Sequence, residues 1–151
     1  MATHTYATRL RWTGSTGLGY AAYERGHHLT VAGAPGVSLT ADPAFGGDPS
    51  HLNPELLVLA AASSCQLLSF LAVAARARVD VVGYTDEAVA EMPEDVHPVR
   101  ITHITLRPHI TIRGSGGAKV ERLVEVAHRE CFVAHTLSCD MSIDPTVSTT
   151  D

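Results

Sequence analysis

Residues 53–75 read Asn-Pro-Glu-Leu-Leu-Val-Leu-Ala-Ala-Ala-Ser-Ser-Cys-Gln-Leu-Leu-Ser-Phe-Leu-Ala-Val-Ala-Ala, and this stretch decides the fold. Pro54 suits the first turn of a helix, where a missing N–H costs nothing, and Asn53 before it is a good N-cap. The stretch from Leu56 to Ala75 is uncharged and consists of helix-forming or small residues. The sequence therefore predicts a helix from Pro54 to Ala77 that is apolar on every side and must be buried.

A run of twenty uncharged residues is also long enough to span a membrane. No aromatic belt brackets it, however, and much of it is alanine. Four polar residues interrupt it: Ser63, Ser64, Gln66 and Ser69. The flanking sequence indicates amphipathic strands, which need a core helix to pack on. We therefore expect a buried central helix and no membrane partner. We expect no signal peptide either, since residues 1–12 contain two arginines and no apolar run.

Length and composition limit the classes of function that this chain can have. A chain of 151 residues is expected to form a single domain, 1–151, with a substantial core. Its net charge of −5 argues against a nucleic-acid groove, so no nucleic-acid partner is expected. Three cysteines without a signal peptide indicate a reducing compartment, and hence a cytoplasmic protein. The odd count argues against a structural disulfide framework.

The remaining pattern is that of a mixed fold. Strands are expected at Thr3–Trp12, Tyr20–Glu24 and His28–Val31, before a long connection at Gly33–His51. After the central helix we expect strands at Val79–Met92 and Val99–Ile112, a helix at Ala118–Cys131 and a last strand at Phe132–Val147. Helices and strands do not alternate regularly in this βββ-α-ββ-α-β order, so the fold class is α+β.

The thiol of Cys65 lies in the middle of the central helix. A cysteine there is usually an inert small hydrophobe, and reactivity requires a cation or donor that stabilises the thiolate. Arg25, in a turn between predicted strands, is one candidate, and Glu55 could orient it through a bidentate pair. Glu55 and Cys65 are ten residues apart, or about 15 Å along a helix. They can share a site only if a second subunit, with its helix antiparallel, brings one Glu55 close to the other Cys65.

The other cysteines allow more than one interpretation. Cys131 closes the second predicted helix, where it is either a buried thiol or, if the helix end docks near Cys65, a resolving thiol. Cys139 is expected to be a buried thiol in the last strand. His128, Cys131, His135 and Cys139 form H-x2-C-x3-H-x3-C, whose ligand types suit zinc. The spacing differs from the usual zinc patterns and crosses a helix-to-strand boundary, so the zinc reading is the weaker alternative.

Two motifs together resemble the OsmC/Ohr family. Asn53 to Cys65 fits Asn-Pro-Glu-Leu-Leu-x-x-Ala-x-x-x-x-Cys, which is similar to the first signature of that family. Residues 41–49, Ala-Asp-Pro-Ala-Phe-Gly-Gly-Asp-Pro, look like the lead-in of an OsmC-like subgroup. Residues 127–131, Ala-His-Arg-Glu-Cys, look like the second cysteine segment. The order of elements agrees as well, so the resemblance covers nearly the whole chain.

The resemblance implies thiol peroxidases that reduce organic hydroperoxides, built as intertwined homodimers with an antiparallel sheet around the central helix and a site at the subunit interface. By motif, Cys65 matches the peroxidatic cysteine, Cys131 the resolving cysteine and Glu55 the family glutamate. Arg25 is the best match for the family arginine. Phe132 stands where the organic-hydroperoxide branch usually has proline.

The implied mechanism needs no bound cofactor. The Cys65 thiolate attacks the peroxide and becomes a sulfenic acid, Cys131 condenses with it, and an external dithiol, a lipoyl group or a small thiol, resets the disulfide. The role would be defence against oxidative or osmotic stress. A different class also stays open, in which the chain is a non-catalytic dimer that binds an apolar small molecule along the helix.

Overall fold

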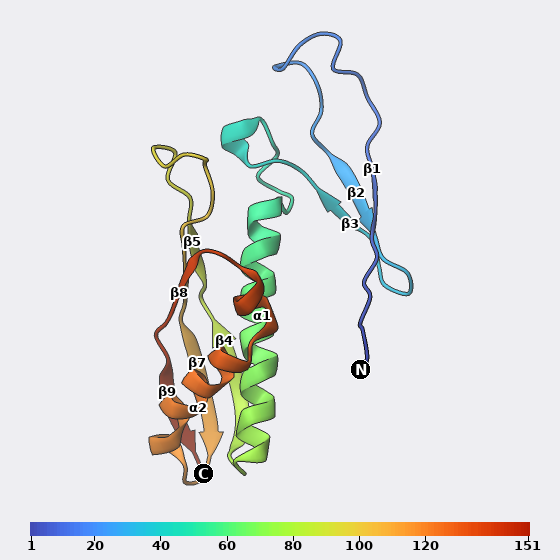
Figure 1. Cartoon of the computed structure of the whole chain (residues 1–151). Helices are drawn as coiled ribbons and strands as arrows, with labels where there is room; N and C mark the ends of the chain where they lie inside the picture. Colours follow the sequence, from blue (N-terminus) through green and yellow to red (C-terminus); the bar gives the residue numbers. More distant parts are fainter. The chain divides into compact units, whose positions relative to one another are not determined.

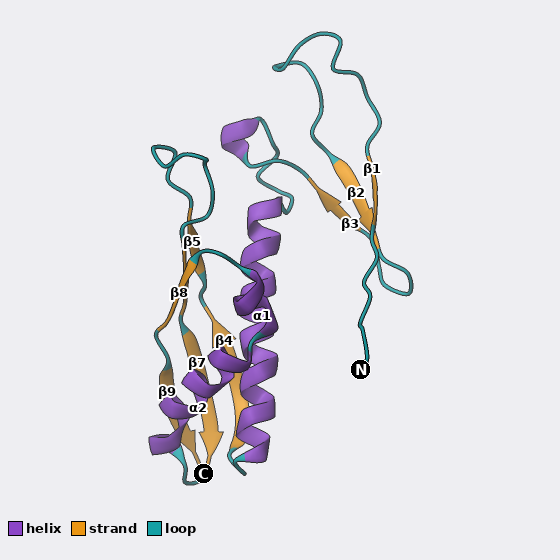
Figure 2. Ribbon diagram, in the orientation of Figure 1, coloured by secondary structure: helices purple, strands orange, loops and turns teal.

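The computed structural model describes residues 1–151 and divides the chain into two compact units, Met1–Leu57 and Val58–Asp151. The first unit consists mainly of loops around a small antiparallel sheet of order β1-β2-β3, as Figure 2 shows. The strands are β1 (Arg9–Arg11), β2 (His27–Thr30) and β3 (Val37–Leu39). Few of its side chains are buried: only Leu39, Thr40 and Asn53 fall below a tenth of their full exposure. This unit therefore has almost no hydrophobic core of its own.

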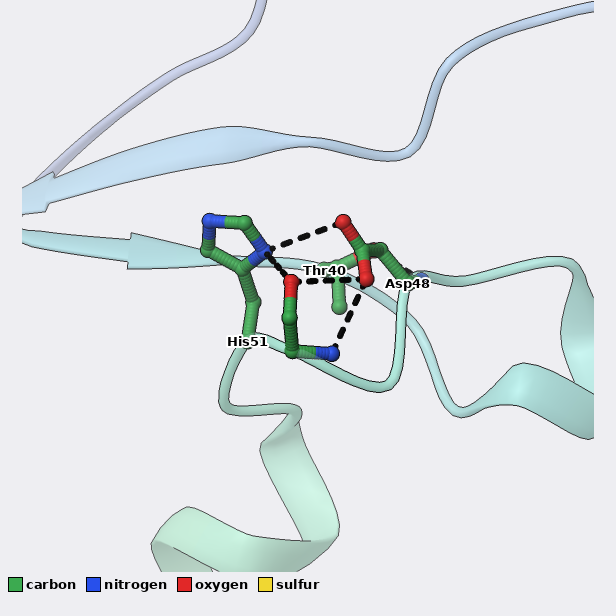
Figure 3. Close-up of polar contacts among 4 residues, drawn as sticks. Thr40, Asp48 and His51 are labelled. Atoms are coloured by element: carbon green, nitrogen blue, oxygen red, sulfur yellow. Dashed lines mark hydrogen bonds and ion pairs between the residues drawn. The ribbon is translucent and has the colours of Figure 1, made fainter.

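The long connection before the central helix is an ordered loop. Its second part is closed where the Thr40 N–H donates to the Leu52 carbonyl at 2.9 Å, and the 3-10 helix η1 (Pro43–Phe45) lies between these two residues. Asp48 organises the second half of the loop, as Figure 3 shows: its backbone N–H donates to Thr40 Oγ1, and its carboxylate accepts from both the N–H and the hydroxyl of Ser50. His51 Nδ1 lies 3.3 Å from Asp48 Oδ2. These contacts fix the conformation of the loop that leads into the central helix.

Helix α1 (Pro54–Arg76) begins where the cap residues predicted it. The Asn53 side chain accepts a hydrogen bond from the N–H of Leu56 at 2.8 Å, which satisfies one of the free donors of the first turn. Glu55 lies in that turn, at the positive end of the helix dipole, and Arg76 lies in the last turn. The predicted boundaries are confirmed to within a residue.

The second unit contains two mixed sheets of three strands each. The first has the order β4-β7-β9 and the second β5-β6-β8. The strands are β4 (Asp80–Asp86), β5 (Val89–Glu91), β6 (His103–Leu106), β7 (Pro108–Arg113), β8 (Asp140–Ile143) and β9 (Thr146–Thr150). In each sheet the central strand pairs antiparallel with an earlier strand and parallel with a strand near the C-terminus. In the sequence, helices α2 (Gly117–Glu130) and α3 (Phe132–Thr136) follow β7 and precede β8.

Two hydrophobic clusters join the helices to these sheets. In the larger one, Phe70 and Val73 of α1 and Val120 and Val124 of α2 pack with Ile110 and other residues of β7 and β9 (Figure 1). In the smaller one, the first half of α1 packs through Ala62 on Ile104 and Leu106 of β6, with partly buried residues of α3 and β8. A single long helix therefore serves as the core element of both sheets.

One face of α1 has no partner within the second unit. Five of its residues are buried, all toward the sheets and α2: Ala62, Gln66, Phe70, Val73 and Ala74. Leu68 is 64% exposed, and Leu56 and Leu71 are also exposed. The helix is long and apolar enough to cross a membrane by length and composition alone, and 22% of its most apolar window is buried. The prediction of burial on all sides is therefore wrong for the second unit taken by itself.

The fold class is confirmed as α+β, but several elements differ from the expectation. The observed order is βββ-α-ββββ-αα-ββ, because Val79–Met92 and Val99–Ile112 each form two strands and Phe132–Val147 forms α3, β8 and the start of β9. The second strand pair breaks at Arg107, whose N–H leaves the ladder and donates to the Asp86 carboxylate. Thr3–Trp12 forms a strand over three residues only, and β3 lies inside the expected connection.

Tyr20–Glu24 forms turns rather than a strand. The physical reason for the turns is Arg25, the residue that follows this segment. The Arg25 guanidinium donates to the carbonyls of Tyr20 and Tyr23, and this curls the segment back on itself. A carbonyl bound in this way is not available to a neighbouring strand.

Candidate functional site

Cys65 and Cys131 lie side by side in the second unit. Cys65 is on α1 and is partly buried, while Cys131 is fully buried. Cys131 both follows α2 and precedes α3, with an extended backbone at φ −74° and ψ 113°. The chain therefore bends at this residue, and its buried thiol and the first N–H groups of α3 come close to Cys65. The end of α2 thus lies near Cys65, which is the condition under which the sequence analysis allowed Cys131 to be a resolving thiol.

The two thiols have opposite pKa shifts. Burial raises the pKa of Cys65, but the backbone N–H of Val133, the thiol of Cys131, the N–H of Phe132 and the hydroxyl of Ser69 outweigh it and hold the pKa below its ordinary value. Burial raises the pKa of Cys131, and the neighbouring Cys65 raises it further. Cys65 is therefore the group that ionises first, and Cys131 stays a thiol beside it.

A cavity of about 550 Å³ opens beside Cys65. Its walls are partly apolar, with Leu68 and a Phe132 side chain that is 83% exposed. Charged groups also line it: Arg76 of α1 pairs with Glu130 of α2 at 2.6 Å, and Arg129 lies next to that pair. The His135 ring, the last lining group, hydrogen-bonds the Arg129 carbonyl at 2.6 Å. The partly exposed Cys65 thus faces a space whose lining is partly apolar and partly charged.

Arg25 and Glu55 lie together in the first unit, lining one small cavity of about 210 Å³ with His27 and Phe45. They do not form an ion pair in this structure. Instead, one buried Glu55 oxygen, Oε2, has no hydrogen-bond partner. An unpaired buried carboxylate oxygen destabilises the folded state. Glu55 Oε2 is therefore placed to accept a hydrogen bond from a donor that its surroundings in the first unit do not supply.

The Arg25 guanidinium is held by tyrosines. It donates to the Tyr23 carbonyl at 2.5 Å and to the Tyr20 carbonyl at 2.6 Å, and its Cζ lies 4.0 Å from the centroid of the Tyr23 ring. Gly46, in the left-handed conformation at φ +82°, allows the guanidinium to approach, because a Cβ there would lie 2.9 Å from Arg25 Cζ. Arginine has five N–H donors, so two carbonyl bonds leave donors for another acceptor.

The remaining candidates lie outside this arrangement. Cys139 is partly buried against the smaller hydrophobic cluster and directly precedes β8 rather than lying within a strand. The zinc pattern does not assemble, since no three His, Cys, Asp or Glu side chains gather closely enough to hold a metal ion. Its four residues lie at the end of α2, at the bend at Cys131, in α3 and directly before β8.

Sequence reasoning missed part of what surrounds Cys65. Ser69 lies one helical turn after Cys65, and that spacing could have identified it. The N–H groups of Phe132 and Val133 carry no sequence signal of their own, because they depend on α3, which was expected to be a strand. Sequence reasoning placed Cys65 on the central helix, where the structure has it, but sought donors that stabilise its thiolate only among cationic side chains.

Comparison with known proteins agrees with the fold and the motifs. The family model described as OsmC-like protein matches residues 47–146. The chain therefore belongs to the OsmC-like family, and the resemblance inferred from the two motifs is confirmed. No curated protein matches the chain.

Solved structures share the fold. An OsmC-like protein of unknown function from Vibrio cholerae O1 biovar eltor has a TM-score of 0.86 at 24% identity, covering 95% of this chain and 100% of that one. The organic hydroperoxide resistance protein OsmC from Legionella pneumophila has a TM-score of 0.73 at 19% identity, covering 98% and 99%. An organic hydroperoxide resistance protein from Elizabethkingia anophelis has a TM-score of 0.69 at 20% identity, covering 99% of both chains.

Proposed function

We propose that this chain is a thiol-dependent peroxidase that reduces organic hydroperoxides. The observation that carries the proposal is the pairing of Cys65, whose pKa is lowered, with a buried Cys131 beside a partly apolar cavity. Family membership and the names of two structural relatives, both organic hydroperoxide resistance proteins, add support. The role would be defence against oxidative or osmotic stress in the cytoplasm.

The reaction begins at Cys65. Its thiolate attacks the distal oxygen of the hydroperoxide, the O–O bond breaks, and the leaving alkoxide takes a proton to become an alcohol. Cys65 is thereby oxidised to a sulfenic acid. The partly apolar lining of the cavity favours an organic hydroperoxide over hydrogen peroxide, because transfer of an apolar group out of water is favourable.

Cys131 then resolves the intermediate. Its sulfur attacks the sulfur of the sulfenic acid, water leaves, and an intrachain disulfide forms. The lowered pKa of Cys65 suits the first step, which needs a thiolate. Part of the raised pKa of Cys131 comes from the neighbouring Cys65, and this part is lost once Cys65 has become an uncharged sulfenic acid, so that Cys131 ionises more readily for the second step. An external dithiol, a small molecule or a lipoyl group, then reduces the disulfide by thiol–disulfide exchange. No bound cofactor is part of the proposal.

Arg25 and Glu55 complete the site through a second subunit. The proposed homodimer pairs two α1 helices in antiparallel fashion, which brings Arg25 and Glu55 of one subunit to Cys65 of the other and compensates the axial offset of about 15 Å between Glu55 and Cys65. Arg25 would stabilise the thiolate and the unpaired Glu55 oxygen would hold it. Support comes from the exposed apolar face of α1 and the sparse core of residues 1–57.

The test is a peroxidase assay with purified protein. Cumene hydroperoxide and hydrogen peroxide serve as alternative substrates, with dihydrolipoamide or dithiothreitol as reductant. We expect faster turnover of cumene hydroperoxide, complete loss of turnover in Cys65→Ser, and a Cys65–Cys131 disulfide in the peptide map after peroxide treatment. A map that pairs Cys139 with Cys65 instead contradicts the role of Cys131. If no peroxide is consumed, the chain is better described as a dimer that binds an apolar small molecule.

A further inference from the structure

Gln66 is the one fully buried polar side chain of α1. It is 0% exposed and lies directly after Cys65. Its Nε2 donates a hydrogen bond to the carbonyl of Val124 on α2 at 3.2 Å. Its Oε1 is also buried and has no partner. The side chain is therefore polar, committed to one contact with α2, and only half satisfied.

The contact of Gln66 with α2 has a geometric relation to the two thiols. Val124, Ala127 and Cys131 are all buried and follow one another at the spacing of a single helix face. Val124 and Cys131 are seven residues apart, about 10 Å along the axis. One turn of α1 therefore makes contacts at both points: Gln66 at Val124 and Cys65 at Cys131. Within the core, these two points add to apolar packing in setting the position of α2 along α1, and at the surface the exposed Arg76–Glu130 pair is a further contact between the two helices.

Stability alone does not account for glutamine at this position. A buried acceptor without a partner destabilises the folded state, and methionine or leucine has a similar volume and no polar atoms to satisfy. Buried polar groups that cost stability are known instead to specify register, as single asparagines do in coiled coils. Gln66 has the features of such a group, because it makes the only polar side-chain contact between α1 and α2 within the core.

We propose that Gln66 is a positioning residue, whose hydrogen bond to Val124 sets the register of α2 on α1 and so holds the Cys131 thiol opposite Cys65. The inference rests on the proposed function only in treating Cys65 and Cys131 as a redox pair. It does not require that a peroxide be the oxidant.

The test measures how readily the two thiols join, using glutathione instead of peroxide. In a Cys139→Ser background, the protein is equilibrated with known concentrations of reduced and oxidised glutathione, quenched with an alkylating agent and quantified by mass spectrometry. The Cys65 thiolate attacks oxidised glutathione and releases one glutathione. Cys131 then attacks the resulting mixed disulfide and releases the second. The equilibrium ratio gives the effective molarity of the pair and hence its reduction potential.

Gln66→Met removes the hydrogen bond and keeps the volume. We expect the effective molarity to fall at least tenfold, with mixed glutathione disulfide on Cys65 accumulating, while the thermal midpoint of unfolding is unchanged or raised. The matched control is Ser63→Ala, which removes another polar contact of α1, the 2.5 Å bond from Ser63 Oγ to Asp86 on β4, and leaves α2 untouched. We expect its effective molarity to stay within twofold of the parent.

Three results would overturn the inference. The first is a folded Gln66→Met variant within twofold of the parent, and the second is a Ser63→Ala control that loses as much as Gln66→Met. The third is failure of both Gln66→Met and Gln66→Leu to fold, which would make Gln66 a residue of general stability. A parent protein that forms the disulfide but consumes no peroxide would contradict the proposed function and leave this inference standing. Normal peroxide turnover with an unaffected Gln66→Met would do the reverse.

Discussion

At the scale of single residues, the environment of Cys65 separates two sources of thiolate stabilisation. Within its own unit the donors are backbone N–H groups and neighbouring hydroxyl and thiol groups, and they already hold the pKa of Cys65 below the ordinary value. A cation such as Arg25 would add to this stabilisation. The two contributions can be separated by substitution, because the first survives the loss of Arg25.

The first prediction concerns Arg25. Arg25→Ala should raise the pKa of Cys65 and slow peroxide reduction, because a cation that favours the thiolate is removed. The pKa is measured as the rate of Cys65 alkylation against pH, with peptide mapping to assign the labelled thiol. Arg9→Ala, a change in the exposed strand β1, is the control and should leave the profile unchanged. An unchanged profile in Arg25→Ala would exclude Arg25 as the partner.

The second prediction concerns His128, whose Nδ1 is buried without a partner. Burial, together with the nearby charge of His135, lowers the pKa of His128. Below a pH of about 6.5, the ordinary histidine value, the unfolded chain therefore binds a proton that the folded chain refuses, so stability falls as the pH drops. The urea midpoint of unfolding should fall less between pH 7.5 and pH 5.5 in His128→Asn than in the parent.

The matched control for His128 is His4→Asn, in the exposed N-terminal segment. This variant should lose stability on acidification as much as the parent does. A His128→Asn protein whose acid destabilisation equals that of the parent would show that another group carries the effect.

At the scale of elements, helix α1 was predictable and α3 was not. The start of α1 is encoded locally, by an N-cap, a proline in the first turn and a long run of helix formers. Residues 132–136, Phe-Val-Ala-His-Thr, are too few to show a helical period and contain residues that favour strands. Their helix depends on the bend at Cys131 and on packing of Val133 and Leu137 against the smaller cluster. Such contacts are not visible in a local pattern.

The candidate site follows the same division. Cys65, Cys131 and Glu55 were identified because they belong to motifs of fixed spacing. The turn at Tyr20–Glu24 was missed because it depends on one side chain, Arg25, which binds carbonyls that a strand would use. The donors from α3 were missed because the helix that supplies them was missed.

The third prediction concerns the first residue of α3. Phe132→Pro removes one N–H that acts on Cys65, while proline at the first helical position keeps the helix intact. We expect a higher pKa of Cys65 in the alkylation profile. Phe132→Ala is the matched control, because it removes the ring and keeps the N–H, and its profile should match the parent. Equal shifts in both variants would assign the effect to the ring.

At the scale of the whole molecule, the exposed face of α1 and the small core of residues 1–57 favour a second copy of the chain. Leu68 and Leu71 lie on that face, on a helix whose opposite side is already covered by two sheets. Large exposed apolar patches on soluble proteins usually mark an interface. The homodimer proposed above would bury this face against its equivalent.

The fourth prediction is that the dimer is obligate. The melting temperature should rise with protein concentration, because dissociation and unfolding coincide. Leu68→Glu should lower that temperature or yield monomer in sedimentation, since it introduces a charge into the buried face. Val82→Glu, at an exposed apolar position on β4, is the control and should remain dimeric. A well-folded monomer of the parent chain at micromolar concentration would contradict the prediction.

Shared sites can be tested directly in mixed dimers. Co-refolding inactive Cys65→Ser with inactive Glu55→Ala should restore part of the activity, because one of the two sites in the mixed dimer then has both residues intact. A mixture that regains nothing would leave the dimer in place and assign Glu55 and Cys65 to the same subunit, or Glu55 to no site at all.

The last two strands, β8 and β9, each pair in parallel with an earlier strand, and this has a consequence for folding during synthesis. Strand β6 pairs with β8 and strand β7 pairs with β9, and both partner strands are synthesised only after α2 and α3. Until then the nascent chain has two unpaired strand edges next to an apolar helix. Such edges can pair with strands of other chains and lead to aggregation. Both sheets of this unit can therefore be completed only after β8 and β9 have been synthesised, and chaperone dependence during synthesis should exceed that of a protein built from local hairpins.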